Sequence, residues 1–328
     1  MNKHITCNIH NKTTTKQLIN KILVAISGGQ DSLYLIKIME NYKYDCHIIK
    51  NKRITISYIY IDHQWRLDSY EQVKHIANYI KSFDNNFYVY QFKNSIVSEK
   101  ICRIHRYYLI IKHAKKNSYD LIITGHSRTD KIETFLHNFL RGRGIEGMTS
   151  LVAQIQVNNT IQLSRPLINM SRSNIYWICK KFSLPIWSDT TNYTYSLSRN
   201  RIRYELIPYL KKYFHERIEN NINYLLYNYY NQHEYIKQNT FKLYINSIHK
   251  IYIALNYLQF IGQSFIIQFK IIQLFYIHSL NIHLTHRMVT KIVKGINRKG
   301  YRYKLGFKIK NMTLNIDYQW IYMTTYIR

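Results

Sequence analysis

Residues 22–32 of the chain spell ILVAISGGQDS, a short apolar run that leads directly into two glycines and a polar triplet. The run has the length and β-branched character of a buried strand, and residues 33–39 have the spacing of a helix. Two adjacent glycines at such a junction let backbone N–H groups approach an anion, and the amino end of the helix adds partial positive charge. The stretch therefore predicts a phosphate-binding loop, with these candidate residues: Ser27, Gly28, Gly29, Gln30, Asp31 and Ser32.

A simpler interpretation of this loop is a tight turn in which Asp31 or Ser32 caps the helix. A bare pair of glycines would favour the turn, whereas the full Ser-Gly-Gly-x-Asp-Ser pattern directly after an apolar strand favours phosphate binding. The loop is not a Walker loop, because the lysine of G-x-x-x-x-G-K-[ST] is missing, and it is not G-x-G-x-x-G. It therefore predicts a phosphate site of another class.

Three further apolar runs follow along the chain, each beside a longer amphipathic stretch: residues 54–61, 87–92 and 121–124. Strands that alternate with helices indicate an α/β fold with a doubly wound, mostly parallel sheet, whose ligand site lies beyond the carboxyl ends of the strands. A helix is expected over residues 99–116. The side that packs on the sheet is expected to carry Ile101, Ile104, Tyr108, Ile111 and Ala114.

The 328 residues carry 47 Lys and Arg against 18 Asp and Glu, a formal charge of +29 that divides into +11 for residues 1–150 and +18 for residues 151–328. A chain this basic indicates a polyanionic partner, with nucleic acid as the first candidate. Its 46% hydrophobic content excludes an intrinsically disordered chain. The four cysteines form no C-x-x-C pair, so they support neither a disulfide framework nor a sulfur-ligated metal site.

A second polar stretch, GHSRTDKIET, covers residues 125–134, directly after the strand expected at residues 121–124. If a helix begins near Ser127, Asp130 and Glu133 lie on one face of it and His126 lies just before it. Two carboxylates beside a triphosphate suit Mg²⁺, which binds through one or two carboxylates together with phosphate oxygens. Taken alone, however, the stretch fits better a solvated helix with an acidic first turn.

The two stretches together resemble known signatures. Residues 27–32 resemble the PP-loop of the N-type ATP pyrophosphatases, and His126-x-x-x-Asp130-x-x-Glu133-Thr134 with LRGRGIEG at residues 140–147 resembles the second signature of the tRNA(Ile)-lysidine synthetases. Six more segments match that family in order: Asp62-His63 with Arg66, Arg106-Tyr107, Arg165-Pro166-Leu167, Asp189-x-x-Asn192, residues 199–203 and Leu206-Ile207-Pro208. The resemblance covers residues 20–215 in register.

This resemblance implies a ligase that joins L-lysine to C2 of the cytidine at the first anticodon position of a CAU-anticodon tRNA(Ile), which changes codon reading from AUG to AUA. ATP is expected to adenylate the cytidine, and AMP and diphosphate are the products. The resemblance places ATP on residues 27–32 and Mg²⁺ on Asp31 and Asp130, with His126 and Glu133 positioning the reacting groups. The implied catalytic residues are thus Asp31, His126, Asp130 and Glu133.

Five arginines are candidates for contact with tRNA, because guanidinium groups bind phosphate and stack on splayed RNA bases. They are Arg141, Arg143, Arg199, Arg201 and Arg203. A solvated basic surface explains the first two equally well, whereas the other three coincide with a family segment. Residues 291–310 interleave basic and aromatic residues, which suits contact with an RNA backbone and bases. An ordinary amphipathic surface explains that stretch almost as well.

Three segments are expected: a flexible lead over residues 1–20, a PP-loop catalytic domain over residues 21–215, and a smaller, mainly helical and basic tRNA-binding domain over residues 216–328. No apolar run is long enough for a membrane span, so no membrane partner is expected. A homodimer stays open as the assembly. Abundant Ile, Asn, Lys and Tyr with few Gly and Pro indicate an AT-rich genome. A plastid-encoded stromal protein is therefore expected, with the cytoplasm of an AT-rich bacterium as the alternative.

The competing function is that of a PP-loop tRNA-binding protein with different or lost chemistry, for example a tRNA thiolase. Thiolases generally need cysteines that carry sulfur or ligate iron. The chain has no C-x-x-C pair and no cysteine near either signature in the sequence, which disfavours a thiolase. The acidic residues Asp31, Asp130 and Glu133 favour an active ligase.

Overall fold

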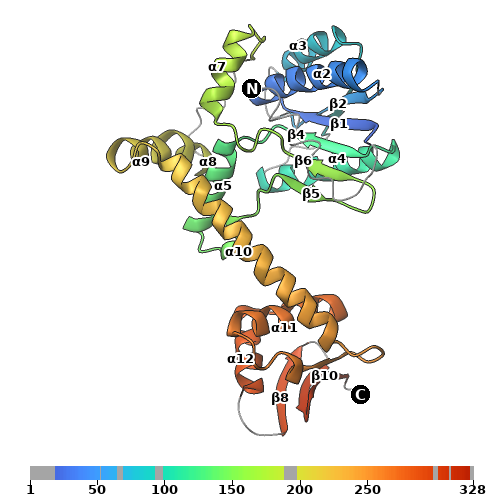
Figure 1. The fold of residues 1–328 in the computed structure, drawn as a ribbon, viewed down its shortest axis with the longest axis vertical. Helices are drawn as coiled ribbons and strands as arrows, with labels where there is room; N and C mark the ends of the chain where they lie inside the picture. Colours follow the sequence, from blue (N-terminus) through green and yellow to red (C-terminus); the bar gives the residue numbers. More distant parts are fainter. Residues whose placement is uncertain are drawn as a thin grey trace. The chain divides into compact units, whose positions relative to one another are not determined.

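The computed structural model describes residues 19–51, 53–64, 69–92, 99–187, 198–297, 302–309 and 312–325. Contacts divide the chain into two compact units, Met1–Leu226 and Tyr227–Arg328, and Figure 1 shows their elements. Within the described ranges, no helix combines the length and the apolar character that a membrane crossing requires.

The first unit is built on a six-stranded sheet in the order β3-β2-β1-β4-β6-β5. Its strands are β1 (Lys21–Ile26), β2 (Thr55–Asp62), β3 (Asn86–Gln91), β4 (Leu121–Thr124), β5 (Gln154–Gln156) and β6 (Gln162–Ser164). All pairs are parallel except the antiparallel pair of β5 and β6. The strand order reverses between β1 and β4, which is where an open parallel sheet places its ligand. The predicted doubly wound, mostly parallel sheet is confirmed.

Helices cover both faces of this sheet, because the side chains of its central strands alternate between two cores. Ile22 and Val24 of β1 belong to one core, and Leu23 belongs to the other. Three helices contribute to the first core and one to the second (Figure 1). The three are α2 (Gln30–Lys50), α3 (Ser69–Lys81) and α7 (Arg172–Lys181), and the one is α4 (Glu99–Lys116).

Helix α4 forms where it was predicted, and Ala114 and Ile111 pack on the sheet side as predicted, but the prediction was wrong for the other three residues. Ile101, Ile104 and Tyr108 are exposed, whereas the helix buries Cys102, Ile110, His113 and Ala114 against the sheet. Two apolar stripes run along this helix, and the sequence spacing alone did not distinguish them. Tyr90 on β3 contributes to the observed orientation, because its hydroxyl group forms a hydrogen bond with the buried His113 at Nδ1, 2.8 Å away.

The remaining helices of the first unit pack on one another around a small separate core. They are α5 (Arg128–Leu140), α6 (Ile145–Met148), α8 (Ser198–Arg201), the π-helix η2 (Ile202–Leu206), α9 (Ile207–Tyr213) and the start of α10 (Ile218–Ser247). Ile132 and Phe135 of α5 meet Ile202, Ile207 and Leu226 in this core. Residues 198–213 thus form one helical run held against α5, with a π-helical segment inside it. Such π-helical turns are frequent at functional sites.

The second unit combines the end of α10 with two helices and a small sheet. Helices α11 (Phe265–Leu280) and α12 (His286–Ile296) pack on a four-stranded antiparallel sheet in the order β7-β10-β9-β8. Its strands are β7 (Ala254–Asn256), β8 (Arg302–Ile309), β9 (Met312–Asp317) and β10 (Trp320–Thr325), and a 3-10 turn, η3 (Tyr257–Gln259), follows β7. Phe275, Tyr276 and Ile292 are fully buried in its core. The predicted helical character of the C-terminal region is confirmed, and the four-stranded sheet adds to that prediction.

Candidate active site

The phosphate loop lies between the carboxyl end of β1 and the first turn of α2. Gly28 has a φ of +80°, and a Cβ there would lie 2.7 Å from Ile76 Cδ1 and 2.8 Å from Gln72 Nε2, so only glycine fits. A Cβ on Gly29 would instead meet nothing within 4 Å. The space in front of Gly29 is therefore open to a ligand.

Hydrogen bonds inside the loop hold its shape. The Ser27 backbone N–H donates to Ser32 Oγ at 2.9 Å, and the two serine hydroxyl groups lie 3.1 Å apart. Gly29 is the N-cap of α2 and offers no side-chain acceptor, so no side-chain capping hydrogen bond forms at the amino end of the helix. N–H groups and the helix dipole at such an end favour an anion. This geometry supports the prediction of a phosphate cradle.

Asp31 and Asp130, which the resemblance assigned to Mg²⁺, start two different helices and lie near enough for their charges to interact. Asp31 lies in the first turn of α2, and Asp130 lies in the first turn of α5, which follows β4. Burial and the negative charge of Asp130 raise the pKa of Asp31 to about 6. Because the two carboxylates repel each other at the mouth of the phosphate loop, a divalent cation between them would relieve the repulsion.

Asp130 itself is held in the ionised form. Its Oδ2 accepts hydrogen bonds from the Ser127 backbone N–H at 2.9 Å and from Ser127 Oγ at 3.1 Å, which closes a capping box at the start of α5. Burial works to raise its pKa, but the nearby Arg199 and Arg203 are among the groups that outweigh burial, so its pKa lies below the ordinary value. The predicted helix start near Ser127 is confirmed, and the residues of the first turn are buried or half-buried rather than solvated.

Glu133 is fully buried and lies between two arginines of the opposite helical run. It accepts a hydrogen bond from Arg199 Nε at 3.0 Å and another from Arg203 Nη2 at 2.9 Å. Arg203 Nη2 also lies 3.3 Å from Asp130 Oδ1. Although burial opposes its charge, the hydrogen bonds and ion pairing with Glu133 raise the pKa of Arg203. The structure thus directs Arg199 and Arg203 at carboxylates.

His126 lies between β4 and α5 and is neutral. Its Nδ1 lies 3.0 Å from Thr124 Oγ1. Burial, together with the charges of Arg165, Arg103 and Arg199, lowers its pKa to about 3 against the opposing charge of Asp130. A neutral imidazole in this position is suited to hydrogen bonding rather than to acid catalysis at neutral pH.

Two residues that sequence reasoning did not place at the site, Arg172 and Cys179, adjoin Gln30 of the phosphate loop. Gln30 Nε2 donates to the Arg172 carbonyl group at 3.2 Å, and the charge of Arg172 lowers the pKa of Asp31. Cys179 Sγ donates to the Gln30 carbonyl group at 3.5 Å. A cysteine that is distant from both signatures in the sequence therefore lies beside the phosphate loop in the fold. Burial and Asp31 raise the pKa of this thiol to about 11, which leaves it protonated and a poor nucleophile.

Other family segments lie around the site. Arg165 is buried and donates to the Val152 carbonyl group at 2.7 Å. Arg106 Nε donates to His63 Nε2 at 3.2 Å, at the carboxyl end of β2. The segment from Asp189 to Asn192 and Arg66 lie outside the described residues.

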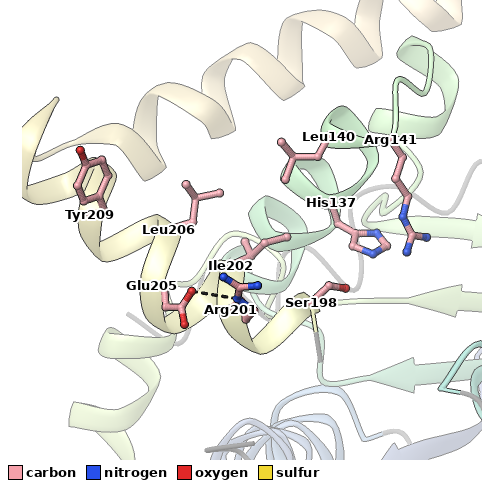
Figure 2. A pocket seen from close by; sticks show the side chains of 9 residues that line it. All are labelled: His137, Leu140, Arg141, Ser198, Arg201, Ile202, Glu205, Leu206 and Tyr209. Carbon is pink, nitrogen blue, oxygen red and sulfur yellow. Dashed lines mark hydrogen bonds and ion pairs between the residues drawn. The ribbon is translucent and has the colours of Figure 1, made fainter. Parts of the chain in front are cut away.

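The remaining arginines predicted to bind tRNA are exposed. Arg141 and Arg143 follow the end of α5, and Arg201 forms a salt bridge with Glu205 at 3.1 Å. Figure 2 shows that Arg141 and Arg201 both line a cavity between α5 and the helical run. The structure therefore divides the five arginines into two that contact buried carboxylates and three that face solvent.

Comparison with known proteins adds a family to this geometry. A family model described as a PP-loop domain matches residues 1–210. The chain is 43% identical over 322 residues to a chloroplastic tRNA(Ile)-lysidine synthase of Gracilaria tenuistipitata var. liui, covering 96% of this chain and 98% of that protein. It is 35% identical to the chloroplastic tRNA(Ile)-lysidine synthase of Pyropia yezoensis, covering 93% of this chain and 90% of that protein.

A solved structure shares the fold at lower identity. The U34-tRNA thiolase NcsA from Methanococcus maripaludis matches with a TM-score of 0.54 and 15% identity, over 68% of this chain and 78% of the thiolase. At this identity the likeness is one of fold.

Proposed function

The chain belongs to the PP-loop domain family and, within it, to the tRNA(Ile)-lysidine synthases, which are ligases, and from that premise we propose its reaction in detail. It joins L-lysine to C2 of the cytidine at the first anticodon position of a CAU-anticodon tRNA(Ile). The cytidine is first adenylated by ATP, and the lysine amine then displaces AMP. The main observation that supports this proposal is that the carboxylates of Asp31 and Asp130 lie near enough to interact, beside a glycine loop with open space in front of it.

We propose that ATP places its phosphates on residues 27–32. The open space before Gly29 and the amino end of α2, which no side chain caps, support this placement. Adenylation needs charge stabilisation at the phosphates, which backbone N–H groups at a helix start supply.

Mg²⁺ fits the same edge of the sheet. Asp31 and Asp130 provide the carboxylate oxygens that this ion prefers, and their mutual repulsion is a reason for a cation to bind there. When bound, the ion would neutralise charge on the phosphates. We assign Glu133 and its two arginines to holding Asp130 in place, because Arg203 reaches both carboxylates.

Exposed basic residues support the assignment of tRNA as the partner. We propose that Arg141, Arg143 and Arg201 contact its backbone, since the other two arginines contact buried carboxylates. The relatives from Gracilaria and Pyropia are chloroplastic, which supports a plastid origin for this chain. We propose that the protein is plastid-encoded and acts in the stroma.

A lysine-transfer assay tests the proposed reaction. The protein is incubated with Mg²⁺, ATP, radiolabelled L-lysine and a CAU-anticodon tRNA(Ile) transcript, and the label in tRNA is counted beside the AMP released. We expect equimolar lysine and AMP, and no label in a transcript whose first anticodon base is guanine. ATP turnover or tRNA binding without lysine transfer would instead show a PP-loop protein with other or lost chemistry.

A further inference from the structure

A cavity of about 540 Å³ lies between the end of α5 and the helical run of residues 198–213. His137, Leu140 and Arg141 line it from α5 and the residue after it, and the run contributes the rest of its wall (Figure 2). Its volume is within the range of small-molecule sites. The cavity lies wholly in the first unit, and none of the groups assigned above to ATP, to Mg²⁺ or to holding Asp130 lines it.

The helical run has two functional faces. Arg199 and Arg203, one turn apart, contact Asp130 and Glu133 on one face. Arg201 and Glu205, also one turn apart, line the cavity and form a salt bridge with each other. A ligand in the cavity would therefore touch the same two turns that hold the buried carboxylates, from the other side.

The lining combines apolar, aromatic and cationic groups. Leu140, Leu206 and Tyr209 provide apolar and aromatic surface, with Leu140 66% exposed and Tyr209 54% exposed. The Arg141 guanidinium has no carboxylate partner among the described residues, so its charge is available to a ligand. Figure 2 shows Tyr209 and Arg141 toward opposite ends of the cavity.

We propose that this cavity binds one unstacked nucleotide of the RNA substrate, in the anticodon loop beside the reacting base. The base stacks on Tyr209 and contacts Leu206, and a phosphate farther along the same strand pairs with Arg141 at the other end of the cavity. Single-stranded RNA bases are recognised in this way, by stacking on aromatic side chains while arginines bind the backbone. A free amino acid fits less well, because Glu205 is neutralised by Arg201 and the run separates the cavity from Asp130. The inference rests on the proposed function for the identity of the RNA.

Equilibrium binding of the full-length protein to the tRNA transcript, without lysine, tests the stacking. Tyr209→Ala is expected to raise the tRNA Kd roughly 5- to 150-fold, the range for loss of one stacked base, and Tyr209→Phe is expected to keep the wild-type Kd. Tyr44→Ala is the matched control, since Tyr44 is 66% exposed near the far end of α2 and does not line the cavity. Because Tyr209 is largely exposed, thermal melting of each variant should match the wild type.

A set of transcripts with one abasic loop position each identifies the nucleotide. One position should weaken binding to the wild type as much as Tyr209→Ala does and should cause no further loss in that variant. An unchanged Kd for Tyr209→Ala, or losses that add at every position, would overturn the proposal. If the wild type transfers lysine and the pocket variant binds normally, only the pocket is wrong. If Tyr209→Ala and one abasic position lose affinity as expected but no lysine is transferred, the pocket stands and the proposed reaction fails.

Discussion

The ionised side chain of Asp31 lowers the stability of the ligand-free protein, because the carboxylate is buried beside Asp130. Its pKa is about 6 in the folded protein against 3.8 ordinarily, chiefly because of burial and secondly because of Asp130. The folded state therefore binds this proton more tightly than the unfolded state, and stability falls as pH rises from about 4 to about 6. Above pH 6 the ionised carboxylate is a net cost that a bound cation would relieve.

The substitution Asp31→Asn is therefore expected to stabilise the ligand-free protein at pH 7.5, by up to about 3 kcal/mol. Urea unfolding at pH 7.5 and pH 4 measures this gain, which should disappear near pH 4, where Asp31 is protonated in the folded wild type. Added Mg²⁺ and ATP should stabilise the wild type more than the variant. A gain that does not change with pH would contradict the assigned cause.

A second prediction at the residue scale concerns the substitution of Asp130. Asp130→Asn removes one of the two carboxylates at the loop but keeps the side-chain size, so lysine transfer should fall at least 100-fold while the tRNA Kd changes less than threefold. The pKa of Asp31 should also fall, because Asp130 raises it, and carboxyl-carbon NMR titration measures that shift. Unchanged turnover would remove Asp130 from the metal site.

Sequence reasoning placed Asp31 and Asp130 just after strand ends, where the structure has them, but it did not predict that Arg199 and Arg203 contact carboxylates. Asp31 and Asp130 each follow a strand end by a few residues, so the rule for parallel sheets brought them together. The contacts of Arg199 and Arg203 depend on how the helical run docks on α5, which sequence spacing does not encode. One signal was present in the sequence. Arg199 and Arg203 are four residues apart, and Asp130 and Glu133 are three residues apart, so each pair lies on one face of its helix and the two pairs can contact each other.

Among the elements, the turn from β1 to α2 has the strictest requirement. Gly28→Ala would place a Cβ against Ile76 and Gln72 at a positive φ, so it should destabilise the protein by about 1–3 kcal/mol and weaken ATP binding. Gly29→Ala is the matched control, because its Cβ meets nothing in the ligand-free protein. Its melting temperature should equal that of the wild type, while ATP affinity falls if phosphate occupies that space. Equal melting temperatures for both variants would contradict this account.

Helix α4 shows where element prediction reached its limit. Its existence followed from its length and composition, but its buried side did not, because Ile101, Ile104 and Tyr108 have the same spacing as a genuine core face. The observed orientation of α4 also involves contacts with strands of the sheet, such as the hydrogen bond between Tyr90 on β3 and His113. A buried polar residue whose partner is distant in the sequence can therefore help to determine which side of a helix is buried, and apolar spacing alone does not reveal it.

At the scale of the whole molecule, the positions of the basic side chains matter for RNA binding as well as the total charge of +29. In the second unit, α12 buries Val289, Ile292 and Val293. Its outward side carries the exposed Arg287, Lys291 and Lys294. Because this side belongs to the half of the sequence with a charge of +18, we expect it to contact the RNA backbone.

Replacing Arg287, Lys291 and Lys294 together by Gln should weaken tRNA binding and reduce the slope of log Kd against log salt by about two units, since each lost phosphate contact removes about 0.7–0.9. The matched control replaces Lys112, Lys115 and Lys116, which are exposed at the end of α4, away from the carboxyl ends of the strands. Both variants lose three charges, so a general effect of net charge would lower both slopes equally. A lower slope for the α12 variant alone would show that the position of the charge, rather than its total, sets the affinity for RNA.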